Sequence, residues 1–468
     1  MLRKAFMLVS GNAFGSALLL LRNLIIARLI SPEDYGIAST FAIAMSIVEM
    51  FSYFGLNQMI VVDKDGDDPG VQKALQGFQL IRGVTSSILL FAIAYPYARF
   101  LGIEEIAWAY QAIAFIPLVN GLQHFDMHRL KRHLNFTPWI VTQAVPPLIS
   151  VLSVWPLALY FGDYRIMLIA LFVQAGAMVI LSHLMAERRY GVTFDFGLIR
   201  RATVFGWPLL LNGILLFGVF NGERLIVGRE LGMSQLAIFS MSITLTLTPT
   251  LVLAGAVQSL FLPQLGAARD RDESFRWLGV AATEAGLAIG IVLLIGVVLL
   301  GGPVIHLLLG PKYAAILEIL VPMTVVQALR VAKTGGSTVA LSKERSGNAA
   351  VANLFRVLSL PVSWYAVTHT GTVMTVIYIA MVAELLGYLV SLNLAARRTG
   401  LPLKPLVLPS ALTAMACVAA LIDARYYPPQ TGLIAHLDWS RWAVVAVCLA
   451  ALASMSALRG YLWRRVVR

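Results

Sequence analysis

The sequence predicts an all-α polytopic membrane protein with about fourteen transmembrane helices. Three observations predict this class: 59% of the 468 residues are hydrophobic, only 13% are charged, and the mean hydropathy is +0.79. Soluble domains carry roughly 25% charged residues, so soluble domains of this composition would leave much of their surface apolar. The hydrophobic content also excludes a disordered chain, and two cysteines in apolar runs, Cys417 and Cys448, exclude a disulfide scaffold.

Apolar runs of about 20 residues predict the spans, because the hydrocarbon core of a bilayer is ~30 Å thick. The first six runs lie near 5–30, 36–61, 77–101, 105–123, 138–161 and 165–186. The next six lie near 204–229, 236–262, 276–301, 313–333, 347–368 and 372–396. The last two lie near 405–424 and 441–462.

The positions of Lys and Arg predict that both termini are cytoplasmic. With the N-terminus inside, 25 of the 36 basic residues fall in inner segments, among them Arg330 and Lys333, and 7 fall in outer segments. This asymmetry follows the positive-inside rule. The net charge of +12 therefore indicates attraction to anionic headgroups on one membrane face, and no nucleic-acid partner is expected.

An internal repeat predicts two similar halves. Asn23–Ser39 aligns without gaps to Arg224–Ser240, with five identities, and six spans separate the copies. An even number of intervening spans makes this a parallel repeat, as is typical of transporters. We therefore expect an N-terminal six-helix lobe at 1–190, a C-terminal six-helix lobe at 200–400, and two additional helices at 401–468. The alternative is chance similarity between apolar helices, which the matching order of spans disfavours.

Polar residues inside the spans predict a wet cavity. At 100° per residue, Asn12, Ser16 and Asn23 of the first span fall within about 40° of each other. Asn212 and Glu223 of the seventh span share the eleven-residue spacing of Asn12 and Asn23. The second span carries another polar stripe, with a carboxylate at its edge: Ser39, Ser46, Tyr53, Asn57 and Glu49. These three spans are expected to form walls of one cavity.

Four short motifs resemble a known family. They are Ala27–Gly36 (ARLISPEDYG), Arg129–Phe136 (RLKRHLNF), Asn221–Arg224 (NGER) and Leu308–Tyr313 (LLGPKY). In this order and spacing they resemble the Wzx/PST-type polysaccharide flippases of the multidrug/oligosaccharidyl-lipid/polysaccharide exporter superfamily. The resemblance covers most of residues 5–400.

The resemblance implies a two-lobed fold of twelve to fourteen helices, like that of multidrug and toxin extrusion (MATE) transporters. It implies a flippase of the bacterial inner membrane that moves a polyprenyl-pyrophosphate-linked oligosaccharide to the periplasmic leaflet. The product would serve exopolysaccharide, O-antigen or capsule assembly, with membrane lipids and other polysaccharide-assembly proteins as partners. By analogy with lipid II flippases, the helices at 405–424 and 441–462 would hold the lipid tail.

Charged residues inside spans are candidates for substrate contact, because such charges are costly and usually face a cavity or a partner. Arginine suits a pyrophosphate, since its planar fork makes bidentate contacts. Arg22 and Arg224 are the first candidates, and Arg82 and Arg356 the second. The expected polar neighbours are Asn12, Asn23 and Asn212. The alternatives are snorkelling or structural pairing with acidic residues: Glu49, Glu223 or Glu230.

Energy coupling is expected to use an ion, H⁺ or Na⁺, or the membrane potential, because the sequence has no P-loop motif. The candidate coupling residues are Glu49, Glu223, Glu284 and Glu384; static ion pairs are the favoured alternative for each. Pro249 is a candidate hinge of the eighth span, with a static kink as the favoured alternative. We expect no catalytic residue, cofactor or metal site. His124, His128 and His133 favour a surface facing lipid headgroups.

Two other functions remain open. A multidrug or cation antiporter of the same superfamily would share the fold, but its cavity should be net acidic, whereas the arginines inside spans favour an anionic substrate. A membrane polysaccharide polymerase or ligase would need a long outer loop with catalytic residues. The longest expected outer loop, 425–440, offers only Asp438 and His436.

Overall fold

The computed structural model describes residues 2–51, 54–345, 347–427 and 438–466, and over these residues the chain is all-helical. Packing divides it into two compact units, Met1–Ala237 and Ile238–Arg468. The helices of the first unit are α1 (Leu2–Leu29), α2 (Pro32–Phe51), α3 (Leu56–Val62), α4 (Pro69–Phe100), η1 (Glu104–Ile106), α5 (Ala107–Ile113), α6 (Phe115–Gly121), α7 (Asp126–Arg132), α8 (Thr137–Ala158), α9 (Arg165–Leu184) and α10 (Phe196–Leu231).

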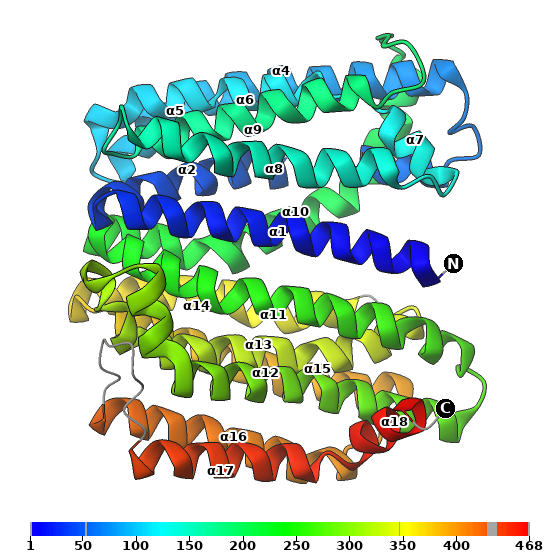
Figure 1. Cartoon of the computed structure of the whole chain (residues 1–468). Helices are drawn as coiled ribbons and strands as arrows, with labels where there is room; N and C mark the ends of the chain where they lie inside the picture. The colour runs from blue at the N-terminus through cyan, green and yellow to red at the C-terminus, as the bar shows by residue number, and fades with distance from the viewer. Residues whose placement is uncertain (1, 52–53, 346, 428–437, 467–468) are drawn as a thin grey trace. The chain divides into compact units, whose positions relative to one another are not determined.

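The second unit begins within α11 and runs to the end of the chain (Figure 1). Its helices are α11 (Met233–Ala267), α12 (Asp272–Leu308), η2 (Pro311–Tyr313), α13 (Ile316–Ser342), α14 (Gly347–Thr370), α15 (Val373–Thr399), α16 (Lys404–Tyr426), α17 (Trp439–Ser454) and α18 (Ser456–Val466). Each of the fourteen expected spans coincides with one helix or with consecutive helices, which confirms the all-α class.

Nine helices of the described residues are long and apolar enough to cross a membrane, or ten if α17 and α18, bent by 66°, form one span. The helices that meet this criterion are α4, α8, α9, α10, α11, α12, α14, α15 and α16. In a bilayer, backbone groups must be satisfied within the segment, which is why such runs become helices. Fourteen crossings remain a prediction, because α1, α2, α13 and the α5–α6 pair are not among the helices that meet the criterion over the described residues.

The second expected span, 36–61, is two helices rather than one. α2 ends at Phe51 and α3 begins at Leu56. Between them Gly55 has φ +62°, a left-handed conformation that favours glycine. A side chain there would also meet the Leu209 side chain, since an added Cβ would lie 2.3 Å from its Cδ1.

α10 packs tightly on α2 in the first unit. A Cβ added at Gly213 would lie 2.6 Å from the carbonyl oxygen of Met50, so the two backbones approach closely only because this residue is glycine.

The repeat places the corresponding span, 204–229, at the start of the C-terminal lobe. The division by packing does not test that repeat, and the lobes at 1–190, 200–400 and 401–468 remain a prediction.

In the second unit, apolar residues of α12 pack on the three C-terminal helices. Leu287, Ile291 and Leu294 belong to one buried cluster with Ala416 and Cys448. A neighbouring buried cluster joins the start of α12 to Tyr461 of α18. Both cysteines are buried free thiols, in agreement with their interpretation as small hydrophobic residues.

Candidate functional site

A polar cavity of about 550 Å³ lies in the first unit, among α1, α2, α6, α8 and α9. Ligand sites in proteins commonly enclose roughly 300–1,000 Å³. Its polar lining residues are Ser16, Arg22, Ser46, Glu49, Asn120, Gln123, Thr142, Gln143 and Gln174. Most of these are amides and hydroxyls, which both donate and accept hydrogen bonds and therefore suit the hydroxyl groups of sugars.

Close packing of α1 on α8 forms one side of the cavity. An added Cβ at Gly15 would lie 2.8 Å from the carbonyl oxygen of Gln143, so only glycine permits this approach. Pro146 and Pro147 follow on α8 and also line the cavity. A larger residue at position 15 would separate the two helices that carry Arg22 and Gln143.

Among the described residues that line this cavity, Arg22 is the only arginine, and neutral partners hold its side chain. Its Nη1 donates to Gln174 Oε1 at 2.6 Å and to Ser150 Oγ at 3.2 Å. Ser150 in turn donates to the carbonyl of Ala170 at 2.9 Å, which fixes its orientation. The residue is 6% exposed, and its buried Nε has no hydrogen-bond partner among the described residues. Neutral groups therefore position the guanidinium, and none of these hydrogen-bond partners among the described residues carries a negative charge.

Glu49 lines the same cavity from α2. Arg82 of α4 lies close enough for its charge to act on the Glu49 carboxylate, although Arg82 does not line the cavity. The described residues of the lining include one Arg and one Glu, so this part of the lining is not net acidic. This arrangement agrees with the pairing expected for Arg82 as an alternative to substrate contact.

Two of the three spans that were expected to line one cavity, those of α1 and α2, do so. Ser16 of α1 and Ser46 and Glu49 of α2 line one cavity, as their spacing predicts. The seventh span does not line it as far as the described residues show, because α10 packs on Met50 and Phe54 through its glycines. α8 and α9 supply walls that the sequence did not predict. In the sequence these two walls are marked only by isolated amides within apolar runs, Gln143 and Gln174.

The other candidates of the first unit lie outside this lining. Arg224 of α10 and Arg22 both act electrostatically on Tyr35, a buried residue of the ARLISPEDYG motif. Asn23 has a buried Oδ1 with no hydrogen-bond partner among the described residues. Glu223 is buried on α10 and Asn212 is exposed there. The side chains of Asn12 and Tyr53 fall outside the described residues.

A second group of charges is buried in the second unit, where α13, α14 and α15 meet. The Glu384 carboxylate is fully buried; its Oε1 accepts from Arg330 Nε at 2.8 Å and lies 3.5 Å from Arg356 Nε. Its Oε2 lies 2.5 Å from Lys333 Nζ, which also donates to Asn353 Oδ1 at 3.2 Å. We call Arg330, Lys333, Arg356 and Glu384 the Glu384 cluster.

This cluster revises the interpretation of Arg330 and Lys333. The sequence placed both among the inner-face charges, because the expected span ended at residue 333. α13 continues to Ser342, so both residues lie near its middle, and their side chains are only 12% and 7% exposed. Glu384 lies within ion-pair distance of three cationic side chains, which agrees with the alternative that it forms static ion pairs rather than coupling transport to an ion.

The remaining candidates have structural partners. Glu284 of α12 accepts a hydrogen bond from the backbone N–H of Leu458 at 2.7 Å, which ties α12 to α18. Pro249 lies within α11, which continues through it as one helix. Beside it, the hydroxyls of Thr246 and Thr250 donate to the carbonyls of Ser242 and Thr246 at 2.7 and 2.5 Å. Among the described residues, no three His, Cys, Asp or Glu side chains gather to hold a metal ion.

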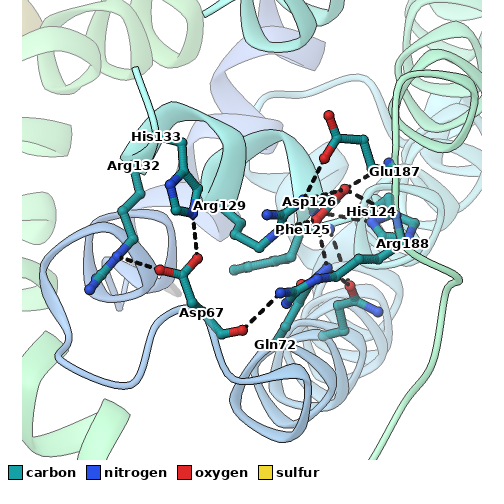
Figure 2. Close-up of polar contacts among 11 residues, drawn as sticks. Asp67, Gln72, His124, Phe125, Asp126, Arg129, Arg132, His133, Glu187 and Arg188 are labelled. Carbon is teal, nitrogen blue, oxygen red and sulfur yellow. Dashed lines mark hydrogen bonds and ion pairs between the residues drawn. The ribbon is translucent and has the colours of Figure 1, made fainter. Parts of the chain in front are cut away.

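A polar network joins α7 to the α3–α4 loop and the α9–α10 segment (Figure 2). At its centre, Asp126 is fully buried and accepts from Arg129 Nε at 2.5 Å and from the backbone N–H of Glu187 at 2.7 Å. Arg188 bridges Gln72 and the carbonyl of Asp67. The Asp67 carboxylate binds Arg132 and His133 at 3.2 and 2.6 Å.

The network shows that the headgroup-facing interpretation of this segment is wrong for three of its residues. His124, His128 and Arg129 are 1%, 6% and 8% exposed. α7, which carries His128 and Arg129, packs against α3 and α8, and the ring of His124 contacts those of His183 and Tyr190. Burial lowers the pKa of His128 to about 3, and the charge of Lys131 adds to this shift. Burial acts to raise the pKa of Asp126, but hydrogen bonds from Arg129 and the Glu187 backbone hold that pKa below its usual value.

Comparisons with solved structures identify the fold. The chain superposes on the lipid II flippase MurJ in its inward closed conformation with a TM-score of 0.69 and 13% identity, over 98% of this chain and 100% of MurJ. An inward-facing MATE family multidrug resistance transporter gives 0.68 and 15%, over 82% and 94%. The chain therefore has the fold of the MOP superfamily transporters.

The family follows from the sequence matches. The family model described as polysaccharide biosynthesis protein matches residues 25–318. The succinoglycan biosynthesis transport protein ExoT of Rhizobium meliloti (strain 1021) is 26% identical over 298 residues, 62% of this chain and 58% of ExoT. The teichuronic acid biosynthesis protein TuaB of Bacillus subtilis (strain 168) is 21% identical over 391 residues, 78% of each chain. The chain belongs to this polysaccharide biosynthesis protein family and is a multi-pass membrane protein.

Proposed function

We propose that the protein is a flippase that moves a polyprenyl-pyrophosphate-linked oligosaccharide repeat unit from the cytoplasmic to the periplasmic leaflet. The repeat unit would serve exopolysaccharide, O-antigen or capsule assembly, and the protein would lie in the bacterial inner membrane with both termini cytoplasmic. The observation that carries this proposal is the polar cavity with Arg22 in its wall.

The lining suits both parts of such a head group. A buried guanidinium attracts an oxyanion and has several donors in one plane, which matches phosphate geometry. The neutral amides and hydroxyls around it, such as Asn120, Gln143 and Gln174, can replace water around sugar hydroxyls. The lipid tail would stay in the bilayer, because moving it into a polar cavity would lose its favourable burial.

Transport would proceed by alternating access, with Pro249 as the candidate hinge. Glu49 is the best-placed coupling residue, since it lines the cavity together with Arg22. Proton uptake by Glu49 would remove the negative charge of the lining and strengthen anion binding. Na⁺ bound to the Glu49 carboxylate would also offset its negative charge and strengthen anion binding.

The test uses cells that lack the chromosomal copy and express Arg22→Ala at the wild-type level. We expect polymer output to fall and lipid-linked repeat units to accumulate in the cytoplasmic leaflet. The matched control is Arg99→Ala, whose side chain is 72% exposed and lies 3.6 Å from Glu104. Normal polymer output from Arg22→Ala would contradict the proposal. Export of cationic compounds, with normal polymer in the deletion strain, would instead indicate an antiporter.

A further inference from the structure

We propose that α18 is an interfacial helix that binds anionic phospholipid headgroups, with Trp463 among the headgroups and Arg459 and Arg464 beside it. The sequence of this helix, SALRGYLWRRV, has three arginines and no acidic residue. Trp463 is 71% exposed and Leu462 is 52% exposed, and the side chains of Arg459 and Arg464 are exposed as well. The proposed function uses the cavity of the first unit and does not need this surface.

The bend before α18 turns this helix toward the membrane plane. α17 has 16 residues, which at 1.5 Å per residue span about 24 Å, so it ends near the edge of a ~30 Å hydrocarbon core. α18 follows at an angle of 66° to α17 (Figure 1). Because spanning helices tilt by about 20° on average, a helix bent this far from one of them lies closer to the membrane plane than to its normal.

Contacts on one side hold α18 against α11 and α12. At its start, the backbone N–H of Leu458 donates to the Glu284 carboxylate at 2.7 Å. One turn further, the ring centroid of Tyr461 lies 4.8 Å from that of Phe261, and the Tyr461 hydroxyl accepts from Gln264 Nε2 at 2.8 Å. These contacts fix the helix with one packed side and one exposed side.

The exposed side combines apolar and cationic side chains. Ala457 and Tyr461, which are buried, define the packed side. At 100° per residue, Arg459, Leu462 and Trp463 all lie within about 60° of the opposite direction. Arginine together with Trp and Leu on the free side of a short helix is typical of helices that lie in the membrane interface.

The arginines and the tryptophan suit an anionic headgroup. The guanidinium carbon of Arg464 lies 4.6 Å from the centroid of the Trp277 ring of α12, and this stacking orients the guanidinium. Arg459 is exposed, although the buried Glu284 lies close enough for the two charges to interact. A guanidinium can donate two hydrogen bonds to one phosphate. Tryptophan is favoured at headgroup level, because its ring is apolar and its N–H is polar.

The end of the second unit where α18 lies is rich in exposed cations. The buried cluster that contains Ala457 and Tyr461 also contains Leu401 and Leu406, so the α15–α16 connection lies beside α18. The exposed cations of this connection are Arg397, Arg398 and Lys404. Attraction to an anionic surface adds up over such a group, so it does not require any one cation to be unpaired. This charge favours an anionic lipid surface as the occupant.

The experiment measures contact between Trp463 and lipid by fluorescence quenching in the full-length protein, reconstituted in liposomes. The probes are brominated phosphatidylglycerol and brominated phosphatidylcholine at equal mole fraction, because bromine quenches tryptophan only at close range. The chain has nine tryptophans, so the Trp463 signal is the difference between each protein and its Trp463→Phe counterpart. We expect phosphatidylglycerol to quench this signal more strongly than phosphatidylcholine does.

Arginine variants then separate headgroup charge from simple contact with the bilayer. Arg459→Gln and Arg464→Gln should each lower the preference for phosphatidylglycerol about fivefold and leave quenching by phosphatidylcholine unchanged. Salt at 1 M, where the Debye length is about 3 Å, should also remove the preference. The matched control is Arg425→Gln, which changes an exposed arginine beside the exposed Tyr426, at the other end of α16 from Lys404. It should change nothing.

Equal quenching of the Trp463 signal by the two lipids would overturn the proposal, because it would indicate contact with the bilayer without recognition of the headgroup. A preference that survives both arginine substitutions and high salt would overturn it as well. Absence of any Trp463 quenching would also overturn it and would indicate a surface turned away from lipid, as a docking site for a protein would be. Since quenching is read without transport, these outcomes leave the proposed function to its own test with Arg22→Ala.

Discussion

Replacing Arg22 removes one cationic side chain whose hydrogen-bond partners are known. Arg22→Ala removes the donor to Gln174 and Ser150, and with it the one guanidinium among the described residues of the cavity lining. A charge-assisted hydrogen bond contributes about 1.5–3 kcal/mol, so losing one contact to the pyrophosphate should lower affinity about 10- to 150-fold. Arg22→Lys keeps the charge but loses the planar fork, and we expect an intermediate effect.

The assay reads transport and folding separately. Removal of Arg22 leaves the Gln174 carbonyl without its donor, at a cost of about 1–3 kcal/mol of folding stability. Expression and thermal stability are therefore matched before lipid-linked repeat units are quantified. Arg99→Ala should behave as wild type, since exposed ion pairs contribute about 0–1 kcal/mol. Equal polymer output from Arg22→Ala and wild type at equal expression would refute the assignment of Arg22.

Three further predictions concern the first unit. Gly15→Val should lower thermal stability by about 1–3 kcal/mol, because its side chain meets the Gln143 carbonyl; an unchanged melting temperature would contradict the packing. Arg129→Ala should destabilise by about 3–5 kcal/mol by leaving Asp126 buried without its cation, whereas the exposed Arg165→Ala should cost under about 1 kcal/mol. His128 binds fewer protons folded than unfolded between its folded pKa of about 3 and its usual value, so stability should fall as pH drops through this window. The loss should be about 2 kcal/mol from pH 6.5 to 5, and it should be absent in His128→Leu; equal pH profiles would refute the burial of a neutral imidazole.

The fold class was predictable because a bilayer permits few solutions. Long apolar runs must become helices, and each expected span indeed coincides with helical structure. The break between α2 and α3 was not predicted, since the apolar run continues through Leu56–Val62; among the described residues, Phe54 and Gly55 lie outside the helices, and Gly55 is in a left-handed conformation. The apolar composition of a segment therefore predicts a helix well, but it does not predict where that helix is interrupted.

The cavity was predictable only where polar residues repeat on one helix face. Ser16 and Ser46 were found in this way, and Glu49 with them. Gln143 and Gln174 are single amides in apolar helices, and one residue defines no periodic stripe. Their role becomes visible only when Arg22 donates to Gln174 across 152 positions of sequence.

The charge clusters show why local sequence misplaces basic residues. Arg330 and Lys333 follow an apolar run, which is also the pattern of cytoplasmic charges, and only the partner Glu384 on α15 distinguishes the two cases. Arg129 lies in a basic segment that resembles a lipid-facing surface. Arg129 is instead buried and forms ion pairs with Asp126 and with Glu187, which comes from a segment distant in the sequence.

The most direct test of the central claim is transbilayer movement of a lipid-linked oligosaccharide in proteoliposomes that contain the purified protein. The account predicts that the protein moves the pyrophosphate-linked lipid and that Arg22→Ala slows this movement at least tenfold, while Arg99→Ala does not. Absence of movement by the wild-type protein, under an imposed proton or sodium gradient and a membrane potential, would contradict it.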